Sequence, residues 1–439
     1  MSKRFFLALI TSFVTLELLG AVITVTSGGD IAAAVSSAAA GDTIEVGEGA
    51  YALAAPIVVD KDVALVAPNG ATLTGNGAKT SLLHVKSPGA FVSGFTLRDA
   101  KVDSASTTPR ADCALYLTSG TVSNCVVASC QIAYDKWEGA GCVTVTGGLL
   151  THCVISNNVG TGPLNNGAVG LLVAGSSTSI VRNSIIAFNQ CQNLQTISVG
   201  VRMVGNANSR LVDCEIYGNK GNAAGTGAGF GAAGLYLDSG TVDRCVIANN
   251  TNTYHEVGGT RICSGGVYAT GTSKIRNSLI VGNKTNRSPA GNAGGITLSS
   301  SATGENLTIV DNSNENTGSV DGVYIRSTTA SLKNSIIAYN GGADGPDLYS
   351  VGTLVTYCCY TNAVPPEGSN QNVPPNFINR SIGNYHLSSV DTSCIDKGND
   401  SVFVVGDLDL DGNPRRSFDH VDIGCFERQP GAGTCMTIR

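Results

Sequence analysis

A spacing of about 30 residues recurs along the middle of the chain, and it constrains the fold more than any other feature. A short motif, in which two or three apolar residues are followed by asparagine, is repeated at this spacing. Its closing residues form one column: Asn158, Asn189, Asn219, Asn250, Asn283, Asn312 and Asn340. A second column consists of glycines that each precede an apolar-x-apolar triplet: Gly170, Gly200, Gly234, Gly266, Gly295 and Gly322. The spacing between successive members varies around 30 residues in the same way in both columns, which predicts a repeat architecture.

The repeat unit is too short to bury an apolar core by itself. Stacking one coil on the next at ~4.8 Å would pair each strand with its equivalents in the neighbouring coils. We therefore predict an all-β fold, a right-handed parallel β-helix of about nine rungs. We interpret the asparagine column as a structural ladder rather than a binding site. Asparagine tolerates the left-handed conformation of a sharp turn, and its amide can bond the next rung.

The first 50 residues predict export and an end cap. Lys3 and Arg4 precede an apolar run over residues 5–19, which is typical of a signal peptide spanning residues 1–21; an uncleaved anchor is the alternative. Asp30 is placed to cap a short helix over residues 31–40, which Gly41 would end. Such a helix would cover the open strand edges of the first coil. We expect the protein to be secreted or held at the cell surface.

Charge excludes one class of partner. Charged residues make up 14% of the chain, with 27 Lys and Arg against 33 Asp and Glu. This balance leaves no basic stripe, so we expect no nucleic-acid partner. We expect a monomer.

The chain has 14 cysteines, and most of them fit the core better than a disulfide framework. Cys125, Cys153, Cys214 and Cys245 occupy an inward position that serine fills in other coils. Parallel neighbours hold their Cβ atoms near the strand spacing, slightly too wide for an unstrained bond. We expect these side chains to be buried thiols. No Cys-x-x-Cys or histidine cluster predicts a zinc site.

Two segments resemble known β-helix families. Residues 31–51, with AAGDTIEV at 39–46 and GAY at 49–51, resemble the opening of pectin-lyase-like β-helices. The coils from about residue 94 to 362 resemble generic parallel β-helix repeats. They are also similar to polymorphic outer-membrane-protein repeats, although isoleucine or valine usually replaces the aromatic residue of that family's aromatic-x-x-Asn motif. The resemblance implies a single-stranded, pectin-lyase-like solenoid.

A third resemblance follows the proline-rich break at residues 364–366. The motifs PNF (375–377), GNYHL (383–387), SCIDKG (393–398), DLDGNPR (409–415) and VDIGCFE (421–427) resemble the choice-of-anchor Q domain. That domain follows secreted bacterial β-helices. The resemblance implies a β-helix over residues 22–363, a small C-terminal module over 364–427 and a tail over 428–439. Cys394 and Cys425 lie in two of its motifs, and the family pattern implies a disulfide between them, which export permits.

Residues that could carry chemistry gather on two loops between the columns: Asp135, Trp137 and Glu138 on one, and Tyr254, His255, Glu256 and Arg261 on the other. Tryptophan beside charges can stack on a sugar ring, and His255 beside Glu256 could act as a base. Solvated loops are the alternative interpretation. The loops are about four rungs, roughly 20 Å, apart. That distance is too long for a catalytic dyad but suits a binding strip.

Asp407, Asp409 and Asp411, followed by Gly412, copy the first half of a calcium loop. Phe418 stands where an EF-hand needs glutamate, so an EF-hand is excluded. Bound Ca²⁺ and a structural turn both remain open. We expect no other cofactor.

The sequence does not identify a reaction. The Asp-Asp pair and Gly-His-Gly segment of polygalacturonase-like enzymes are missing. The leading hypothesis is a surface or secreted scaffold that binds polysaccharide or surface glycans without catalysis. A polysaccharide lyase or glycoside hydrolase of pectin-lyase-like fold is one alternative. An adhesin resembling polymorphic outer-membrane proteins is the other.

Overall fold

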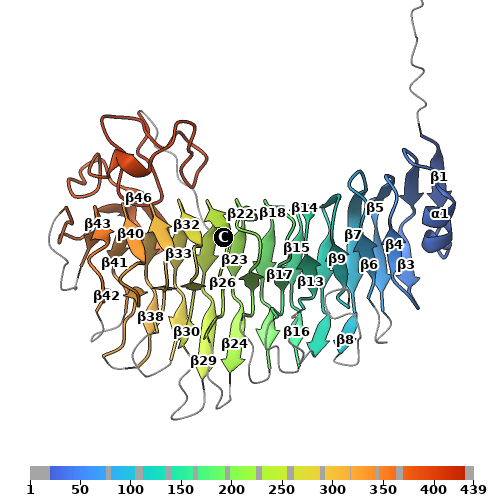
Figure 1. Ribbon diagram of the computed structural model, residues 1–439, viewed down its shortest axis with the longest axis horizontal. Coiled ribbons are helices and arrows are strands. Elements are labelled where there is room, and N and C mark those ends of the chain that lie inside the picture. The colour runs from blue at the N-terminus through green and yellow to red at the C-terminus, as the bar shows by residue number, and fades with distance from the viewer. Residues whose placement is uncertain are drawn as a thin grey trace, which may run out of the picture.

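The computed structural model describes residues 20–75, 81–103, 112–133, 140–161, 167–192, 198–223, 230–254, 262–286, 292–316, 318–341, 346–361 and 369–430. Over most of this length the chain winds into a stack of coils whose strands pair in parallel with their equivalents in the neighbouring coils. Figure 1 shows the coils following one another along a rod, from the N-terminal strands at one end to the C-terminal strands at the other. The nearly all-β architecture expected from the repeats is confirmed.

Three parallel sheets form the sides of the rod. Sheet B has 11 strands: β4 (Ile57–Val59), β6 (Leu83–Val85), β9 (Leu115–Leu117), β13 (Val143–Val145), β17 (Leu171–Val173), β21 (Val201–Met203), β26 (Leu235–Leu237), β31 (Val267–Ala269), β35 (Ile296–Leu298), β39 (Val323–Ile325) and β42 (Leu348–Ser350). Sheet C has eight strands: β8 (Lys101–Asp103), β12 (Gln131–Ala133), β16 (Val159–Gly160), β20 (Gln190–Cys191), β24 (Lys220–Ala223), β29 (Thr251–Tyr254), β34 (Lys284–Thr285) and β38 (Ser313–Asn314).

Sheet A has 23 strands and bends along its length, so that most coils give it two limbs. The stack begins with β1 (Val22–Val25), β2 (Thr43–Val46), β3 (Gly49–Ala52), β5 (Ala64–Thr74) and β7 (Phe91–Arg98). First limbs follow: β10 (Thr121–Ser123), β14 (Gly148–Thr151), β18 (Ser179–Arg182), β22 (Arg210–Val212), β27 (Thr241–Asp243), β32 (Lys274–Arg276), β36 (Thr303–Glu305), β40 (Ser331–Lys333) and β43 (Val355–Thr356). Second limbs are β11 (Val126–Ala128), β15 (Val154–Ser156), β19 (Ile185–Ala187), β23 (Glu215–Tyr217), β28 (Val246–Ala248), β33 (Leu279–Val281), β37 (Thr308–Val310), β41 (Ile336–Ala338) and β44 (Cys359–Tyr360).

Within the described residues, eight coils carry a strand in all three sheets, close to the rungs expected from the sequence. One typical coil runs through β26, β27, β28 and β29. Its inward residues Leu235, Leu237, Val242 and Ile247 are fully buried. Because equivalent residues of neighbouring coils are in register, these side chains continue one apolar core along the rod.

The asparagine column lies inside the rod, at the turn between sheets A and C. Each amide of the column donates to the side-chain oxygen of the next asparagine, from Asn158 to Asn340, at 2.9–3.0 Å. The prediction that these asparagines take the left-handed conformation is wrong, because this conformation lies one position earlier in the chain. It belongs instead to the residue before each of them: Asn157, Phe188, Gly218, Asn249, Gly282, Asp311 and Tyr339, with φ between 53° and 65°.

The glycine column packs against this ladder. A Cβ placed on Gly234 would lie 2.9 Å from the Asn250 amide nitrogen and 2.6 Å from the carbonyl oxygen of Gly266. The same crowding recurs at Gly200 against Asn219 and at Gly266 against Asn283. This contact recurs from coil to coil, which explains why the spacings of the asparagine and glycine columns change together along the sequence.

The N-terminal end of the rod carries helix α1 (Ile31–Ser37), as Figure 1 shows. The Asp30 carboxylate accepts a hydrogen bond from the Ala33 amide, as the sequence predicts for an N-cap. The helix stops at Ser37, before the predicted end at residue 40. No helix among the described residues is long and apolar enough to cross a membrane.

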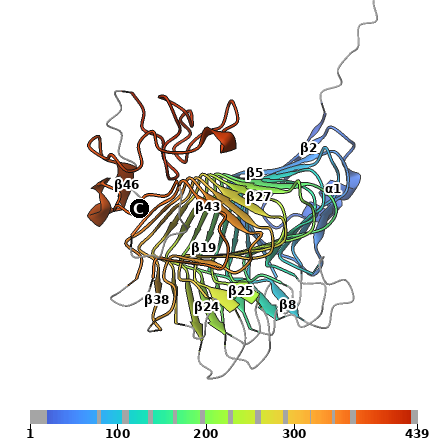
Figure 2. The same cartoon turned by 60° about the vertical axis from the view of Figure 1, so that its left-hand side comes forward.

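Residues 374–427 form a small unit beside the rod, which we call the C-terminal module. It contains the antiparallel strands β45 (Phe377–Asn379) and β46 (Asn384–Leu387), and the 3₁₀ turns η1 (Arg380–Ile382) and η2 (Asp400–Val402). Figure 2 shows the module against the flank of the last coils rather than on the rod axis. Its Phe377, Leu387 and Cys394 share one apolar cluster with Leu279 and Ile336 of sheet A. Two further strands, β25 (Phe230–Ala232) and β30 (Ile262–Ser264), pair beside sheet B.

Candidate functional site

Most of the residues that the sequence singles out for binding lie outside the described residues: Asp135, Trp137, Glu138, His255, Glu256 and Arg261. Tyr254 ends β29 and is described only in its backbone. The strands from which the two loops leave are β12 and β29, and β16, β20 and β24 lie between them in sheet C. The loops therefore start about four rungs, roughly 20 Å, apart along the rod.

The middle residue of each sheet B strand forms an outward-facing column beside the core. Strand register aligns Tyr236 with Arg202 on one side and with Tyr268 on the other. The whole column is Val58, His84, Tyr116, Thr144, Leu172, Arg202, Tyr236, Tyr268, Thr297, Tyr324 and Tyr349. It is rich in tyrosine, Arg202 is its one arginine, and its members Thr144, Leu172, Tyr268 and Thr297 are buried. The signal was present in the sequence, because most of these residues are the x of an apolar-x-apolar triplet.

The tyrosines of the column stack on one another. The rings of Tyr236 and Tyr268 lie 5.5 Å apart at 16°, and those of Tyr324 and Tyr349 lie 4.9 Å apart at 25°. The Arg202 guanidinium carbon lies 5.4 Å from the centre of the Tyr236 ring. Stacking between coils places the ring planes across the rod, so the inner rings turn their edges outward. Tyr349 differs, because β42 is the last strand of sheet B and 47% of this side chain is exposed.

A second outward column follows immediately after each strand. Its backbone is aligned by coil-to-coil hydrogen bonds, such as Ser299 N to Ala269 O at 2.9 Å and Arg326 N to Leu298 O at 2.8 Å. Apolar residues fill some positions of this column, and its hydroxyl-bearing and charged members are Asp60, Lys86, Thr118, Thr146, Asp238, Thr270, Ser299 and Arg326. All of these residues are exposed or half-buried. The outer face of sheet B therefore combines hydroxyl groups, cations and one accessible aromatic ring.

Burial sets the protonation of the stacked tyrosines. Burial, together with the nearby Asp238 carboxylate, raises the pKa of Tyr236 to about 12. Burial also raises the pKa of Tyr268 and of Tyr324. Tyrosines with a raised pKa keep their protons at neutral pH. They can donate hydrogen bonds but are poor general bases.

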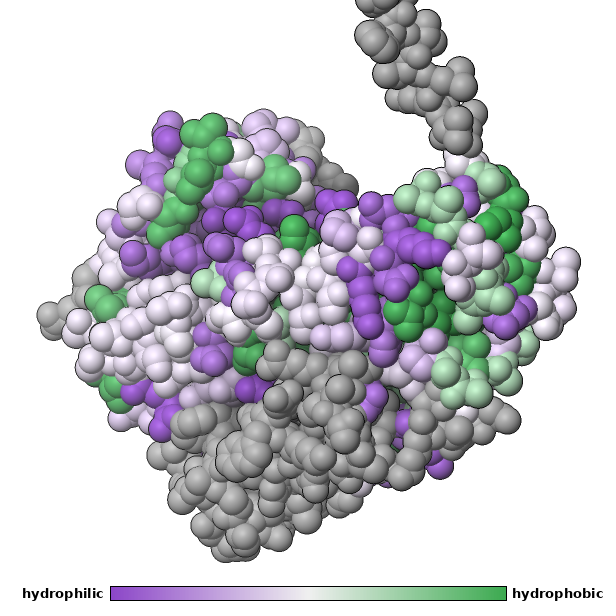
Figure 3. Space-filling model, turned by 45° about the vertical axis from the view of Figure 1, so that its right-hand side comes forward, coloured by the Kyte–Doolittle hydropathy of each residue, from purple (hydrophilic) through white to green (hydrophobic). Residues whose placement is uncertain are grey.

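The side of the rod seen in Figure 3 has no continuous hydrophobic area. Hydrophilic and weakly polar residues cover most of the coloured surface, and the hydrophobic residues form small separate areas. A surface of this kind suits a hydrated partner better than a lipid or a large apolar protein face.

The carboxylates that suggested a calcium loop have three different partners. Asp407 pairs with Arg276 of β32 at 2.5 Å, and Asp411 lies 2.6 Å from Nε2 of His386. Asp409 is buried and accepts hydrogen bonds from the amides of Asn413 and Glu427. Across the described part of the chain, no three His, Cys, Asp or Glu side chains gather as a metal site. The three carboxylates therefore point to different partners and do not converge on one point, and bound Ca²⁺ stays a prediction.

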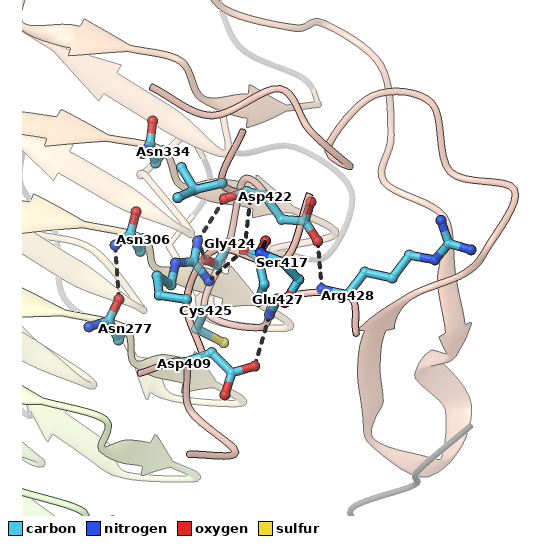
Figure 4. A network of polar contacts seen from close by, with 12 residues as sticks. Asn277, Asn306, Asn334, Asp409, Ser417, Asp422, Gly424, Cys425, Glu427 and Arg428 are labelled. Carbon is cyan, nitrogen blue, oxygen red and sulfur yellow. Dashed lines mark hydrogen bonds and ion pairs between the residues drawn. The ribbon is translucent and has the colours of Figure 1, made fainter. Parts of the chain in front are cut away.

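The DLDGNPR and VDIGCFE motifs meet in the buried centre of the C-terminal module (Figure 4). Arg415 is fully buried and donates to the carbonyl oxygens of Asp422 and Gly424 at 2.6 and 2.7 Å. The Glu427 carboxylate accepts from the amides of Ser417 and Asp422, and burial raises its pKa to about 8. These side chains therefore stabilise the fold of the module.

The predicted bond between Cys394 and Cys425 is not formed in this structure. Both residues are buried free thiols. Cys125, Cys153, Cys214 and Cys245 are also buried free thiols, each in the core.

Comparison with protein families supports the architecture directly. Residues 114–314 match the family model described as a right handed beta helix region. The chain is a right-handed parallel β-helix. No curated protein matches the sequence.

Solved structures similar to this β-helix include two named polysaccharide lyases. The pectate lyase Pel9A is 14% identical, with 93% of this chain and 96% of that chain covered and a TM-score of 0.46. The PL6 family alginate lyase AlyGC is also 14% identical, with coverage of 89% and 60% and a TM-score of 0.46. A mannuronic acid specific family 6 lyase from human gut microbiota is 11% identical, with coverage of 77% and 86% and a TM-score of 0.35.

Proposed function

We propose that this β-helix is a secreted or cell-surface protein that binds polysaccharide along the outer face of sheet B and does not cleave it. The observation that carries the proposal is the pair of outward columns. Hydroxyl groups of Thr118 and Thr146 lie on two adjacent coils, and those of Thr270 and Ser299 lie on two further adjacent coils. They can exchange hydrogen bonds with sugar hydroxyls. Two such groups along one face suit an extended polymer.

The C-terminal end of the strip provides the strongest single contact. Tyr349 is supported on one face by the Tyr324 ring, and Arg326, which directly follows the strand of Tyr324, interacts with Tyr268. An aromatic ring fixed in this way can stack on the apolar face of a sugar without losing much conformational entropy. The guanidinium of Arg326 can pair with a carboxylate of an acidic polysaccharide.

The absence of cleavage is supported by the chemistry of the same columns. A glycosidase needs two carboxylates across the bond that breaks. Among the described residues of the two columns, the carboxylates are Asp60, after β4, and Asp238, after β26, and they lie six coil steps apart. A lyase needs a base that is deprotonated at working pH, and the tyrosines of the strip have raised pKa values. Binding is therefore the activity that these side chains favour.

The first prediction tests the strip through Tyr349. Tyr349→Ala removes the exposed stacking ring, so the affinity for a bound polysaccharide should fall roughly threefold to tenfold. Phe188→Ala is the matched control, because Phe188 has a similar exposure of 48% but lies at the turn between β19 and β20. Both variants would be measured by affinity electrophoresis in gels containing acidic or neutral polysaccharides. Equal losses in the two variants, or no loss in either, would place the binding site elsewhere.

A further inference from the structure

Two cysteines meet where the C-terminal module contacts the last coil of the rod. Cys359 begins β44, and Cys394 belongs to the module. Both side chains are fully buried in the same apolar cluster, and both sulfurs border one side chain, that of Ser393. The Ser393 hydroxyl lies 3.9 Å from the Cys359 sulfur and 3.6 Å from the Cys394 sulfur. The two sulfurs therefore lie side by side across the boundary between module and rod.

This pair differs from the thiol pairs inside the rod. Cys125 contacts Cys153, and Cys214 contacts Cys245, from equivalent positions on neighbouring coils. Their backbones are held at the strand spacing of ~4.8 Å, which is wide for the Cβ separation of a disulfide. Cys394 lies on a segment without regular secondary structure and is not held at that spacing. Its backbone is held by the Asp391 carboxylate at 2.7 Å and by the Ile423 amide at 2.9 Å, both from the module, and not by a strand ladder that fixes its distance from Cys359.

Cys425 has different neighbours. Its amide donates to the Thr308 hydroxyl at 3.0 Å, and its thiol also contacts Thr308, on β37 of the rod. The thiol contact of Cys394 is with Cys359. The structure therefore favours a partner for Cys394 that differs from the one implied by the family resemblance.

We propose that Cys359 and Cys394 form a disulfide that ties the C-terminal module to the last coil. Each thiol loses its proton, one sulfur–sulfur bond forms, and two electrons pass to a small disulfide oxidant such as glutathione disulfide, which becomes two thiols. Burial raises the pKa of Cys394, so the docked thiol reacts slowly. The bond forms while the module docks during folding.

Disulfide mapping of the wild-type protein tests the proposal. The denatured protein is refolded in a mixture of reduced and oxidised glutathione, alkylated without reduction, digested and analysed by mass spectrometry. The expected result is a linked peptide pair containing Cys359 and Cys394, with Cys425 alkylated. Alkylation of both Cys359 and Cys394, or a link between Cys394 and Cys425, would overturn the proposal.

Serine variants give an independent check. Cys359→Ser should leave Cys394 fully alkylated after refolding, whereas Cys425→Ser should keep the linked pair. Reduction should also speed proteolysis of the wild-type module on the order of tenfold or more, because the bond closes a long loop. The same reduction should not change the rate of proteolysis of the module in Cys359→Ser. Equal sensitivity of wild type and Cys359→Ser to reduction would contradict the bond.

Discussion

Asn250 shows at the scale of one residue how the rod is held together. Its amide donates to the Ile216 carbonyl and the Asn283 side chain, and its side-chain oxygen accepts from the backbone and amide of Asn219. Each of these groups is buried. Asn250→Ala would leave several of them without partners, at a cost of ~1–3 kcal/mol for each. We expect the free energy of unfolding to fall by at least ~2 kcal/mol in urea denaturation, and Asn208→Ala, at an exposed turn, to change it little. Equal effects would contradict the role of the ladder.

Asp347 ends the asparagine ladder and should make stability depend on pH. Its carboxylate accepts from the Asn340 amide at 2.9 Å and from the Thr361 hydroxyl at 2.6 Å. Burial raises its pKa to about 6 from an ordinary value of 3.8. A raised carboxyl pKa means that the folded state holds the proton more tightly, so this group's contribution to stability is greatest below pH ~4 and declines as pH rises to ~6.

Asp347→Asn should remove that decline, because an amide can continue the ladder without a charge. The stability of the variant relative to wild type should rise between pH ~4 and ~6, by about 3 kcal/mol, and stay constant above. Urea denaturation of both proteins at several pH values measures the difference. A difference that does not change with pH would show that Asp347 ionises normally.

Among the elements, the C-terminal module is held on the rod by a few polar contacts around its apolar cluster. Asp311, at the turn after β37, accepts from Nε of Arg380 at 2.9 Å and from the Tyr385 hydroxyl at 2.8 Å. Asp99 takes the same left-handed turn position in an early coil, at φ 58° against 57°, but pairs with the exposed Arg98 and has no module beside it. The two residues form a natural matched pair.

Asp311→Asn should loosen the module, because it keeps a residue that tolerates the turn but removes the charge that Arg380 binds. Limited proteolysis of the module should become roughly twofold to fivefold faster, which corresponds to the modest strength of a partly exposed ion pair. Asp99→Asn should digest like the wild type. If both variants, or neither, were cleaved faster, docking would not depend on the Asp311 contacts.

The parts of the fold that could be predicted are those that recur in every coil of the stack. Asn250 and Gly234 recur because every coil presents the same crowded turn, and only small or amide side chains fit there. Cys394 has no such repetition. Its neighbour Cys359 depends on how a non-repeating module docks, which no spacing in the sequence encodes. Tyr349 was missed for another reason: its triplet ends in Ser350 rather than in an apolar residue, so the pattern that marks the other positions does not mark it, and the strand register is what aligns it with Tyr324.

The molecule as a whole is a rod, and each coil contributes one residue to each outward column on its long side. The hydroxyls of the second sheet B column, together with Arg326 and Tyr349, give this side several weak contacts in a line. A ligand that engages such a line gains affinity with each additional unit that reaches another coil. A single catalytic pocket behaves differently, because units beyond the reacting bond soon add little.

Affinity for oligosaccharides of increasing length, prepared from a polysaccharide that the protein binds, tests the central claim most directly. Each length is titrated by calorimetry, and the same solutions are then analysed for shorter products. The account predicts that affinity rises steadily over several sugar units and that every oligosaccharide is recovered intact. An affinity that stops rising after one or two units, or the release of shorter products, would contradict it.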